Sequence, residues 1–196
     1  MKERIVFVND EFINETEAKV SIFDRGFLFA DAVYEVTAII DGKILEWDGH
    51  ITRLKRSLKE LDIKMPIETN KLLDIHYKLI DKNNLTEGLI YLQISRGEDD
   101  RSFDYPDSNV KPTIVLFTQV KSLQESNLSK NGMKVISVPD IRWARRDIKT
   151  VQLLAPSMCK MMAKKSNKDD AWMVQDGFVT EGTSNNAHII TKDNVL

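Results

Sequence analysis

The chain is organised around the stretch Arg142-Trp143-Ala144-Arg145-Arg146-Asp147-Ile148-Lys149. A β-rich run, residues 133–138, precedes it, and a helical run from about residue 156 to 165 follows it. We therefore expect Lys149 to lie in a connection between a strand and a helix, where open α/β sheets place reactive groups. Three arginines lie within seven residues of Lys149. Nearby cations disfavour protonation of an amine, so they favour the neutral, nucleophilic form, although a solvated basic loop is the commoner interpretation of such a run.

Composition and charge argue against several classes of protein. The chain has 196 residues, of which 42% are hydrophobic and 30% charged, and its formal net charge is −2. This is long enough for one large domain or two small ones, and it gives no support for nucleic-acid or membrane binding. Cys159 is the single cysteine, so no internal disulfide can form, and we expect a cytoplasmic protein with Cys159 as a small buried hydrophobe. The three histidines lack metal-ligand spacing, and we predict no metal site.

The pattern of apolar residues predicts a mixed α/β (α+β) protein in two parts. The strands expected are 4–8, 19–23, 33–40, 43–47, 89–97, 112–118, 133–138, 171–174, 178–182 and 187–191. Three helices are expected. The first begins after a cap at Asp48, and the other two span residues 69–82 and 156–165. Residues 121–131 are polar and rich in Ser and Asn, so they are the best linker candidate, between domains at 1–120 and 132–196.

A reactive lysine of this kind suits an aldehyde cofactor. A lysine that forms Schiff bases fits pyridoxal phosphate, which acts as an electron sink. That cofactor also needs an acid at its pyridine nitrogen and a cation at its phosphate. Glu181 follows an expected strand and precedes small polar residues, and Arg53 lies one turn into a helix, away from the apolar stripe. Taken singly, each is more often a solvated surface charge.

Several short motifs, spread in order through nearly the whole chain, carry a resemblance to one family. They are Asp24-Arg25-Gly26, Asp31-Ala32-Val33-Tyr34-Glu35-Val36, His50-Ile51-Thr52-Arg53-Leu54, Ser95-Arg96-Gly97, Asp140-Ile141-Arg142-Trp143, Asp147-Ile148-Lys149 and Thr180-Glu181-Gly182-Thr183-Ser184-Asn185. The chain resembles the class IV aminotransferases, the fold-type IV pyridoxal phosphate enzymes, and is most similar to their D-amino acid branch. The resemblance implies a two-domain fold whose second domain, residues 132–196, binds the cofactor.

The resemblance also implies roles for individual residues. Lys149 would form the Schiff base with the cofactor and later move the proton at the α-carbon, Glu181 would pair with the pyridine nitrogen, and Arg53 would bind the phosphate. Arg142 would support the cofactor, and Tyr34 would line the substrate pocket.

Three further residues follow from the same resemblance. Thr183 and Ser184 would lie near the edge of the cofactor. Arg101 would help to bind the substrate carboxylate in the neighbouring subunit's site, a task that suits the bidentate fork of an arginine.

The chain departs from the family's pattern in two ways. The D-amino acid enzymes have a histidine two residues after the arginine of this loop, and Phe103 stands there in this chain. The family's chain also continues well beyond the position of Leu196, so we expect the second domain to be incomplete.

The sequence as a whole predicts a homodimeric class IV aminotransferase with a ping-pong mechanism. We expect D-amino acids such as D-alanine as donors and pyruvate or 2-oxoglutarate as acceptor. A branched-chain aminotransferase and a 4-amino-4-deoxychorismate lyase are the alternatives within the family, and the form Asp31-Ala32-Val33-Tyr34-Glu35 favours the D-amino acid branch over the branched-chain branch. An alternative of another class is a non-catalytic remnant that serves as a dimerising module, against which Lys149, Glu181 and Arg53 argue together.

Overall fold

The chain folds into two compact units. The computed structural model describes residues 3–196. The first unit runs as far as Gln124 and also includes Asp147–Val151, and the second consists of Glu125–Arg146 and Gln152–Leu196. Lys149 therefore belongs to the first unit, although the chain on both sides of its segment belongs to the second. The domain boundaries expected from the sequence pattern stay predictions.

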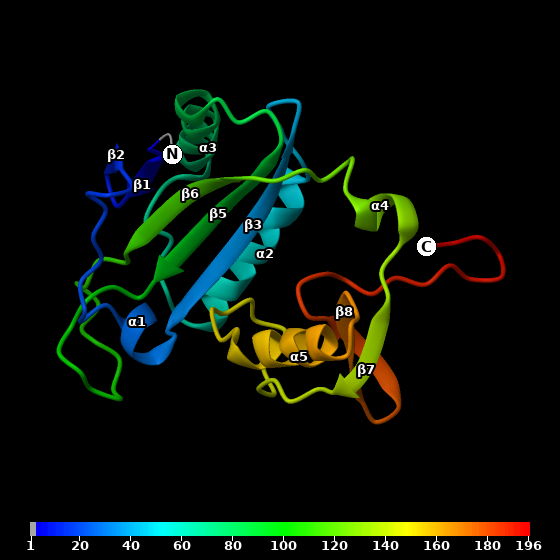
Figure 1. The fold of residues 1–196 in the computed structure, drawn as a ribbon. Coiled ribbons are helices and arrows are strands. Elements are labelled where there is room, and N and C mark those ends of the chain that lie inside the picture. The colour runs from blue at the N-terminus through cyan, green and yellow to red at the C-terminus, as the bar shows by residue number, and fades with distance from the viewer. Residues whose placement is uncertain (1–2) are drawn as a thin grey trace. The chain divides into compact units, whose positions relative to one another are not determined.

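The first unit is built on a six-stranded antiparallel sheet with the order β2-β1-β6-β5-β3-β4 (Figure 1). Its strands are β1 (Ile5–Val8), β2 (Glu11–Asn14), β3 (Ala32–Ile40), β4 (Lys43–Ile44), β5 (Gly88–Ser95) and β6 (Ile114–Val120). The expected hairpin between β3 and β4 is confirmed: Asp41 and Gly42 have φ of 50° and 70°, as its two-residue turn requires.

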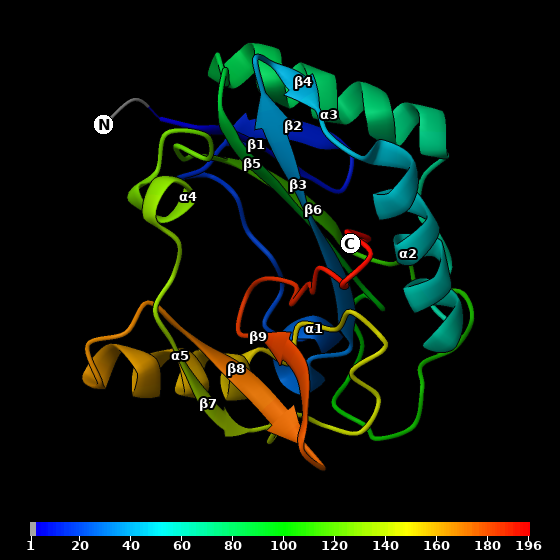
Figure 2. The same cartoon turned by 90° about the vertical axis from the view of Figure 1, so that its right-hand side faces the viewer.

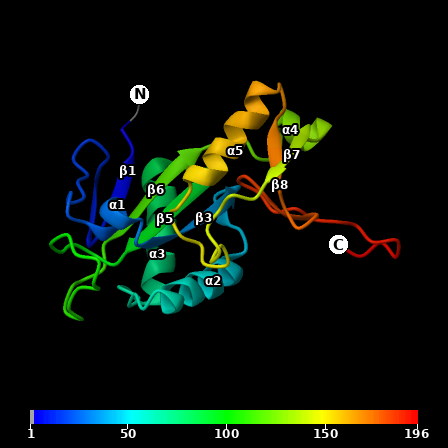
Figure 3. The same cartoon turned by 90° about the horizontal axis from the view of Figure 1, so that it is seen from below.

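Helices α2 (Trp47–Glu60) and α3 (Thr69–Asn83) lie on the same side of this sheet (Figures 2 and 3). Every second side chain of β3 is buried, which is the pattern of a strand with one face against helices. The helices contribute the apolar stripes predicted from the sequence, including Leu54 and Leu72, to the same core as Ile39 and Ile90 of the sheet. The short helix α1 (Arg25–Phe29) precedes β3.

The second unit has a three-stranded sheet of β7 (Val135–Pro139), β8 (Asp170–Gln175) and β9 (Phe178–Gly182). β7 and β8 are parallel and are connected through α5 (Leu154–Lys165), whereas β8 and β9 form an antiparallel hairpin. A small helix, α4 (Asn127–Asn131), precedes β7. Cys159 of α5 is buried beside Val138 and Met173, which confirms it as a small core residue.

Three expectations about local structure are wrong. Residues 19–23 and 187–191 form no strand, because strand-forming residues need a neighbouring strand to pair with and neither segment has one. β1 pairs with β6 and with β2, a strand that the sequence analysis did not predict and that follows the turn at Asn9 directly. Asp48 does not cap α2: the cap position is Glu46, in a left-handed conformation with φ of 52°.

Among residues 3–196, no helix combines the length and the apolar character that a membrane span requires.

Candidate active site

The segment that carries Lys149 is attached to the edge of β3 by backbone hydrogen bonds. The Tyr34 N–H donates to the Lys149 carbonyl oxygen over 3.1 Å, and the Val151 N–H donates to the Ala32 carbonyl oxygen over 3.2 Å. The pairing is antiparallel. It therefore places Lys149 opposite Tyr34, where cross-strand side chains meet on one face.

The alternation of a strand then decides which side chains of this segment face the core. Ile148 and Thr150 are buried, and Ile148 joins the main core of the first unit. Lys149, between them, is only partly buried, and its Nζ donates to the Tyr34 hydroxyl over 3.2 Å and lies 4.4 Å from the centre of the ring. The structure thus brings together two of the residues predicted for the site.

Tyr34 begins a stack of aromatic rings across three strands. The centres of the Tyr34 and Tyr91 rings are 5.7 Å apart, and those of Tyr91 and Phe117 are 4.9 Å apart. The Tyr91 hydroxyl donates to the Gln93 side chain over 2.8 Å. Burial, and to a lesser extent the neighbouring Tyr34, raises the pKa of Tyr91 to about 12, so this phenol remains a neutral donor. The stack fixes the ring on which Lys149 lies.

Arg53 lies on α2 and is held by a buried carboxylate. Glu35, next to Tyr34 but on the opposite face of β3, accepts from Arg53 Nε over 2.7 Å and from Nη2 over 2.6 Å, while His50 Nδ1 lies 2.7 Å from it. Burial opposes ionisation of Glu35, but the hydrogen bonds from Arg53 and His50 outweigh it and hold the pKa of Glu35 below its usual value. The Arg53 side chain itself remains 43% exposed, so it can meet an anionic group from solution.

Helix α2 also holds the Lys149 segment. Arg56, one turn beyond Arg53, donates to the Asp147 backbone carbonyl over 2.7 Å and to its carboxylate over 2.6 Å. The Lys149 N–H donates to the Ser57 hydroxyl over 3.3 Å. The sequence predictions missed Glu35, Arg56 and Ser57 as functional residues. The spacing of Arg53 and Arg56, three residues apart on one helical face, was the available signal for Arg56.

In the second unit, Arg142 and Glu181 form an ion pair that is anchored by Asp140. Arg142 donates to the fully buried Asp140 carboxylate over 3.0 and 2.9 Å and also to Glu181. The Thr180 hydroxyl donates to Asp140 over 2.7 Å, and the Arg146 Nε lies 3.4 Å from the same carboxylate. Hydrogen bonds from Arg142 hold the pKa of Asp140 well below its usual range. Two of the arginines that precede Lys149 in sequence are therefore paired with a carboxylate of their own unit.

The residues after Glu181 surround a second buried carboxylate. Asp170 accepts hydrogen bonds from the Thr183 hydroxyl and the Asn185 amide, and Lys160 lies 3.3 Å from it. Burial opposes its ionisation, but these hydrogen bonds keep the pKa of Asp170 below its usual value. Ser184, between these two residues, is exposed.

Arg101 lies in the loop 98–109 of the first unit, beside aromatic rings. Its guanidinium carbon is 5.4 Å from the ring centres of both Phe29 and Phe103. These two rings meet edge to face at 5.6 Å. Phe103 therefore contacts the arginine that it follows in the loop.

The predicted site residues divide between the two units. Lys149, Tyr34, Arg53 and Arg101 belong to the first, and the residues expected at the cofactor ring belong to the second: Arg142, Glu181, Thr183 and Ser184. That both sets contact one cofactor stays a prediction. Within residues 3–196, no group of three or more His, Cys, Asp or Glu side chains is arranged to hold a metal ion.

Comparison with known proteins supports the relationship expected from the motifs. The family model for amino-transferase class IV matches residues 32–196. The D-alanine aminotransferase of Staphylococcus aureus (strain MSSA476) is 37% identical over 191 residues, which cover 97% of this chain and 67% of that protein. The D-alanine aminotransferase of Bacillus licheniformis is 35% identical, with 97% and 66% covered. The chain thus spans about two thirds of the length of these curated relatives.

Solved structures share the fold at low sequence identity. The branched-chain amino acid aminotransferase of Escherichia coli is 16% identical with a TM-score of 0.79, over 93% of this chain and 63% of that one. A branched-chain amino acid aminotransferase from T.th., solved with pyridoxamine 5'-phosphate, is also 16% identical, with a TM-score of 0.78 and the same coverage. The mixed α/β fold of the fold-type IV enzymes is therefore confirmed. This chain belongs to the class IV aminotransferase family.

Proposed function

We propose that this chain acts as a pyridoxal phosphate-dependent aminotransferase that moves an amino group from a D-amino acid, such as D-alanine, to a 2-oxo acid. The observation that carries the proposal is the amine of Lys149, held 3.2 Å from the Tyr34 hydroxyl on a segment fixed to both β3 and α2. Class IV aminotransferases use pyridoxal phosphate. The D-alanine aminotransferase relatives support the choice of donor.

The side chains present fit this cofactor. The Arg53 side chain is 43% exposed and its guanidinium is held by the buried Glu35, which suits a phosphate because the cation is oriented before the anion arrives. Glu181 is paired with Arg142 and 40% exposed, so it remains an acceptor for a protonated ring nitrogen. Lys149 supplies the amine that an aldehyde group requires.

The remaining cofactor contacts follow the motif after β9. We place Thr183 and Ser184 at the edge of the cofactor, with Arg142 in a supporting role through its ion pair with Glu181. The hydrogen bond from Thr183 to the buried Asp170 supports this, since it fixes the turn on which both side chains lie.

In the mechanism that we propose, bound pyridoxal phosphate supplies an electron sink for the α-carbon of the amino acid. The amine of Lys149 accepts the α-proton of the donor and returns a proton to the acceptor. The Tyr34 hydroxyl accepts a hydrogen bond from Nζ and so orients the amine towards its task. The donor leaves as a 2-oxo acid before the second 2-oxo acid enters, which is a ping-pong sequence.

The substrate carboxylate is assigned to Arg101. We propose a cytoplasmic homodimer in which this loop reaches the partner subunit's site. Within the family, the alternative functions are those of a branched-chain aminotransferase and of a 4-amino-4-deoxychorismate lyase. The alternative outside enzyme catalysis is a non-catalytic dimerising module. Phe103 in place of a histidine removes one polar group from the carboxylate site, so we expect weaker binding of the donor than in enzymes that keep the histidine.

The test is the absorption spectrum of the purified chain with added pyridoxal phosphate, compared with Lys149→Ala and with the control Lys164→Ala on α5. We expect a visible band in the wild type and the control, and covalent attachment to Lys149 after borohydride reduction. Half-reactions with D- and L-alanine and L-leucine then identify the donor. Conversion of L-leucine alone would refute the D-amino acid assignment, and a wild type with no band beyond that of free cofactor would refute the enzymatic function of this chain.

A further inference from the structure

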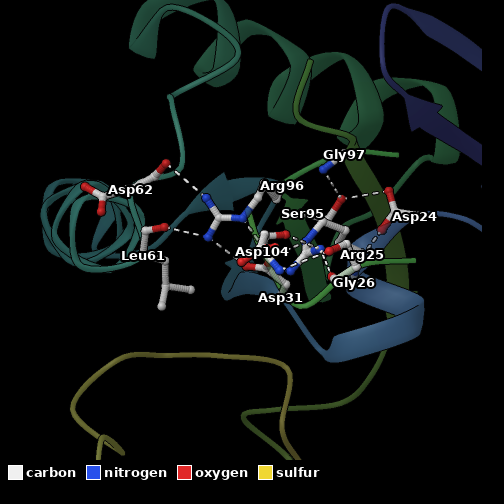
Figure 4. Close-up of polar contacts among 11 residues, drawn as sticks. Asp24, Arg25, Gly26, Asp31, Leu61, Asp62, Ser95, Arg96, Gly97 and Asp104 are labelled. Atoms are coloured by element: carbon white, nitrogen blue, oxygen red, sulfur yellow. Dashed lines mark hydrogen bonds and ion pairs between the residues drawn. The ribbon is translucent and has the colours of Figure 1, made fainter. Parts of the chain in front are cut away.

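Two buried arginines share the carboxylate of Asp31, the residue directly before β3. The Arg25 Nε donates to Asp31 over 2.8 Å, and Arg96 donates to the two oxygens of the same carboxylate over 2.7 and 3.0 Å (Figure 4). The side chains of Arg25, Arg96 and Asp31 are only 4%, 8% and 10% exposed. Two cations share one anion, so the remaining N–H donors of both buried guanidinium groups need acceptors of their own.

Those other donors bind the backbone of a loop and of a helix end. The Arg25 Nη1 donates to the carbonyl oxygens of Ser102 over 2.7 Å and Asp104 over 3.2 Å. Arg96 donates to the carbonyl oxygens of residues 61 and 62, just beyond α2, over 2.6 and 3.2 Å. The ring of Tyr105 then covers Arg96, with its centre 3.6 Å from the guanidinium carbon. Together these contacts tie the loop 98–109 to the end of α2.

The two arginine-containing motifs are also fixed to each other. The Ser95 hydroxyl donates to Asp24 over 2.7 Å, and the Arg25 N–H donates to the Gly97 carbonyl oxygen over 2.9 Å (Figure 4). Asp24 in turn accepts from the Gly26 N–H over 2.8 Å, capping the short helix α1. The base from which both guanidinium groups extend is therefore rigid.

We propose that this clamp, Arg25–Asp31–Arg96, orders the loop 98–109 and thereby positions Arg101. Arg101 directly precedes Ser102, whose carbonyl oxygen is the closest acceptor of the Arg25 fork in this loop. The inference rests on the proposed function, in which Arg101 binds the substrate carboxylate. Arg25, Asp31 and Arg96 are then positioning residues: they bind no substrate, but they fix the backbone from which the binding arginine extends.

The first test measures the order of the loop. Trypsin cleaves after Arg101, whereas the bond after Lys111 resists it because Pro112 follows. Arg25→Lys keeps the charge but removes the planar fork, so one ammonium cannot serve Asp31 and both loop carbonyls in the same geometry. We expect cleavage after Arg101 to be about tenfold faster in Arg25→Lys than in the wild type. Arg4→Lys, at an exposed ion pair of the same unit, is the matched control and leaves the rate unchanged.

The second test separates positioning from general weakening of the fold. For Arg25→Lys we expect the KM for the amino donor to rise about tenfold while kcat changes by less than about twofold, because carboxylate binding is lost to the ground state and the transition state alike. The absorption band of the bound cofactor stays as in the wild type, since its contacts lie elsewhere.

Unchanged cleavage in Arg25→Lys would overturn the clamp. Faster cleavage with an unaltered KM would overturn the positioning of Arg101. If the wild type transfers no amino group at all, the proposed function fails, while the cleavage rates still decide whether the clamp orders the loop.

Discussion

His76 gives the chain a pH dependence whose size follows from its surroundings. It lies on α3, is 1% exposed, packs edge to face against Trp47 and has its Nδ1 2.8 Å from the Leu72 carbonyl oxygen. Burial lowers the pKa of His76 from 6.5 to about 4. The unfolded chain therefore takes up a proton near pH 6.5 that the folded chain refuses until about pH 4. The contribution of neutral His76 to the free energy of unfolding is therefore present above about pH 6.5. It decreases as the pH falls towards 4, by up to about 1.4 kcal/mol per pH unit.

The measurement is the free energy of unfolding in urea at about pH 7, 6 and 5, a range that stays above the titration of most carboxylates. His76→Asn keeps an amide N–H for the Leu72 carbonyl but does not titrate. Between pH 7 and 5 the wild type should lose about 2 kcal/mol more than His76→Asn. His188→Asn, at an exposed position, is the control and should follow the wild type. Parallel curves for the wild type and His76→Asn would refute the reasoning.

Three further changes test the fold and the clamp. Asp31→Asn removes the carboxylate that two buried arginines share and should cost about 3–5 kcal/mol in urea unfolding, whereas a loss below about 1 kcal/mol would show that the cluster is solvated. Leu72→Ala, at a fully buried site, should cost about 2–5 kcal/mol and the partly buried neighbour Leu73→Ala clearly less; equal losses would contradict the assigned core face of α3. Gly97→Ala, where a Cβ would lie 2.1 Å from a backbone carbonyl oxygen, should lower the melting temperature more than Gly177→Ala, where φ is also positive but nothing lies within 4 Å.

The periodic elements were predictable because their own residues determine them. The apolar spacing of α2 and α3 and the alternation of β3 each describe one face against one core. Residues 19–23 and 187–191 show the limit of such reasoning. Both have strand-forming composition, yet a strand exists only where another strand offers its backbone, and no local pattern contains that information.

The same limit applies to the site: sequence motifs identify its residues, but only the pairing of strands determines which of them are in contact. Lys149 and Tyr34 could each be named from their motifs, whereas the 3.2 Å contact between them depends on the pairing of a distant segment with β3. The Arg25–Asp31–Arg96 clamp was even harder to predict from the sequence. Its acceptors are the backbone carbonyls of Ser102 and Asp104, and any residue type in those positions would present the same oxygen atoms.

The attachment of residues 147–151 to the first unit has a consequence for the order in which the chain can fold during synthesis. Residues 125–146 must leave the ribosome before Lys149 can reach β3, so the first unit is completed only after β7 of the second has been made. Until then, the stretch of β3 from Ala32 to Tyr34 lacks the partner that it finally has at this edge. A nascent chain that stalls in this interval presents this strand edge unpaired, and the pairing with the lysine segment is what later covers it.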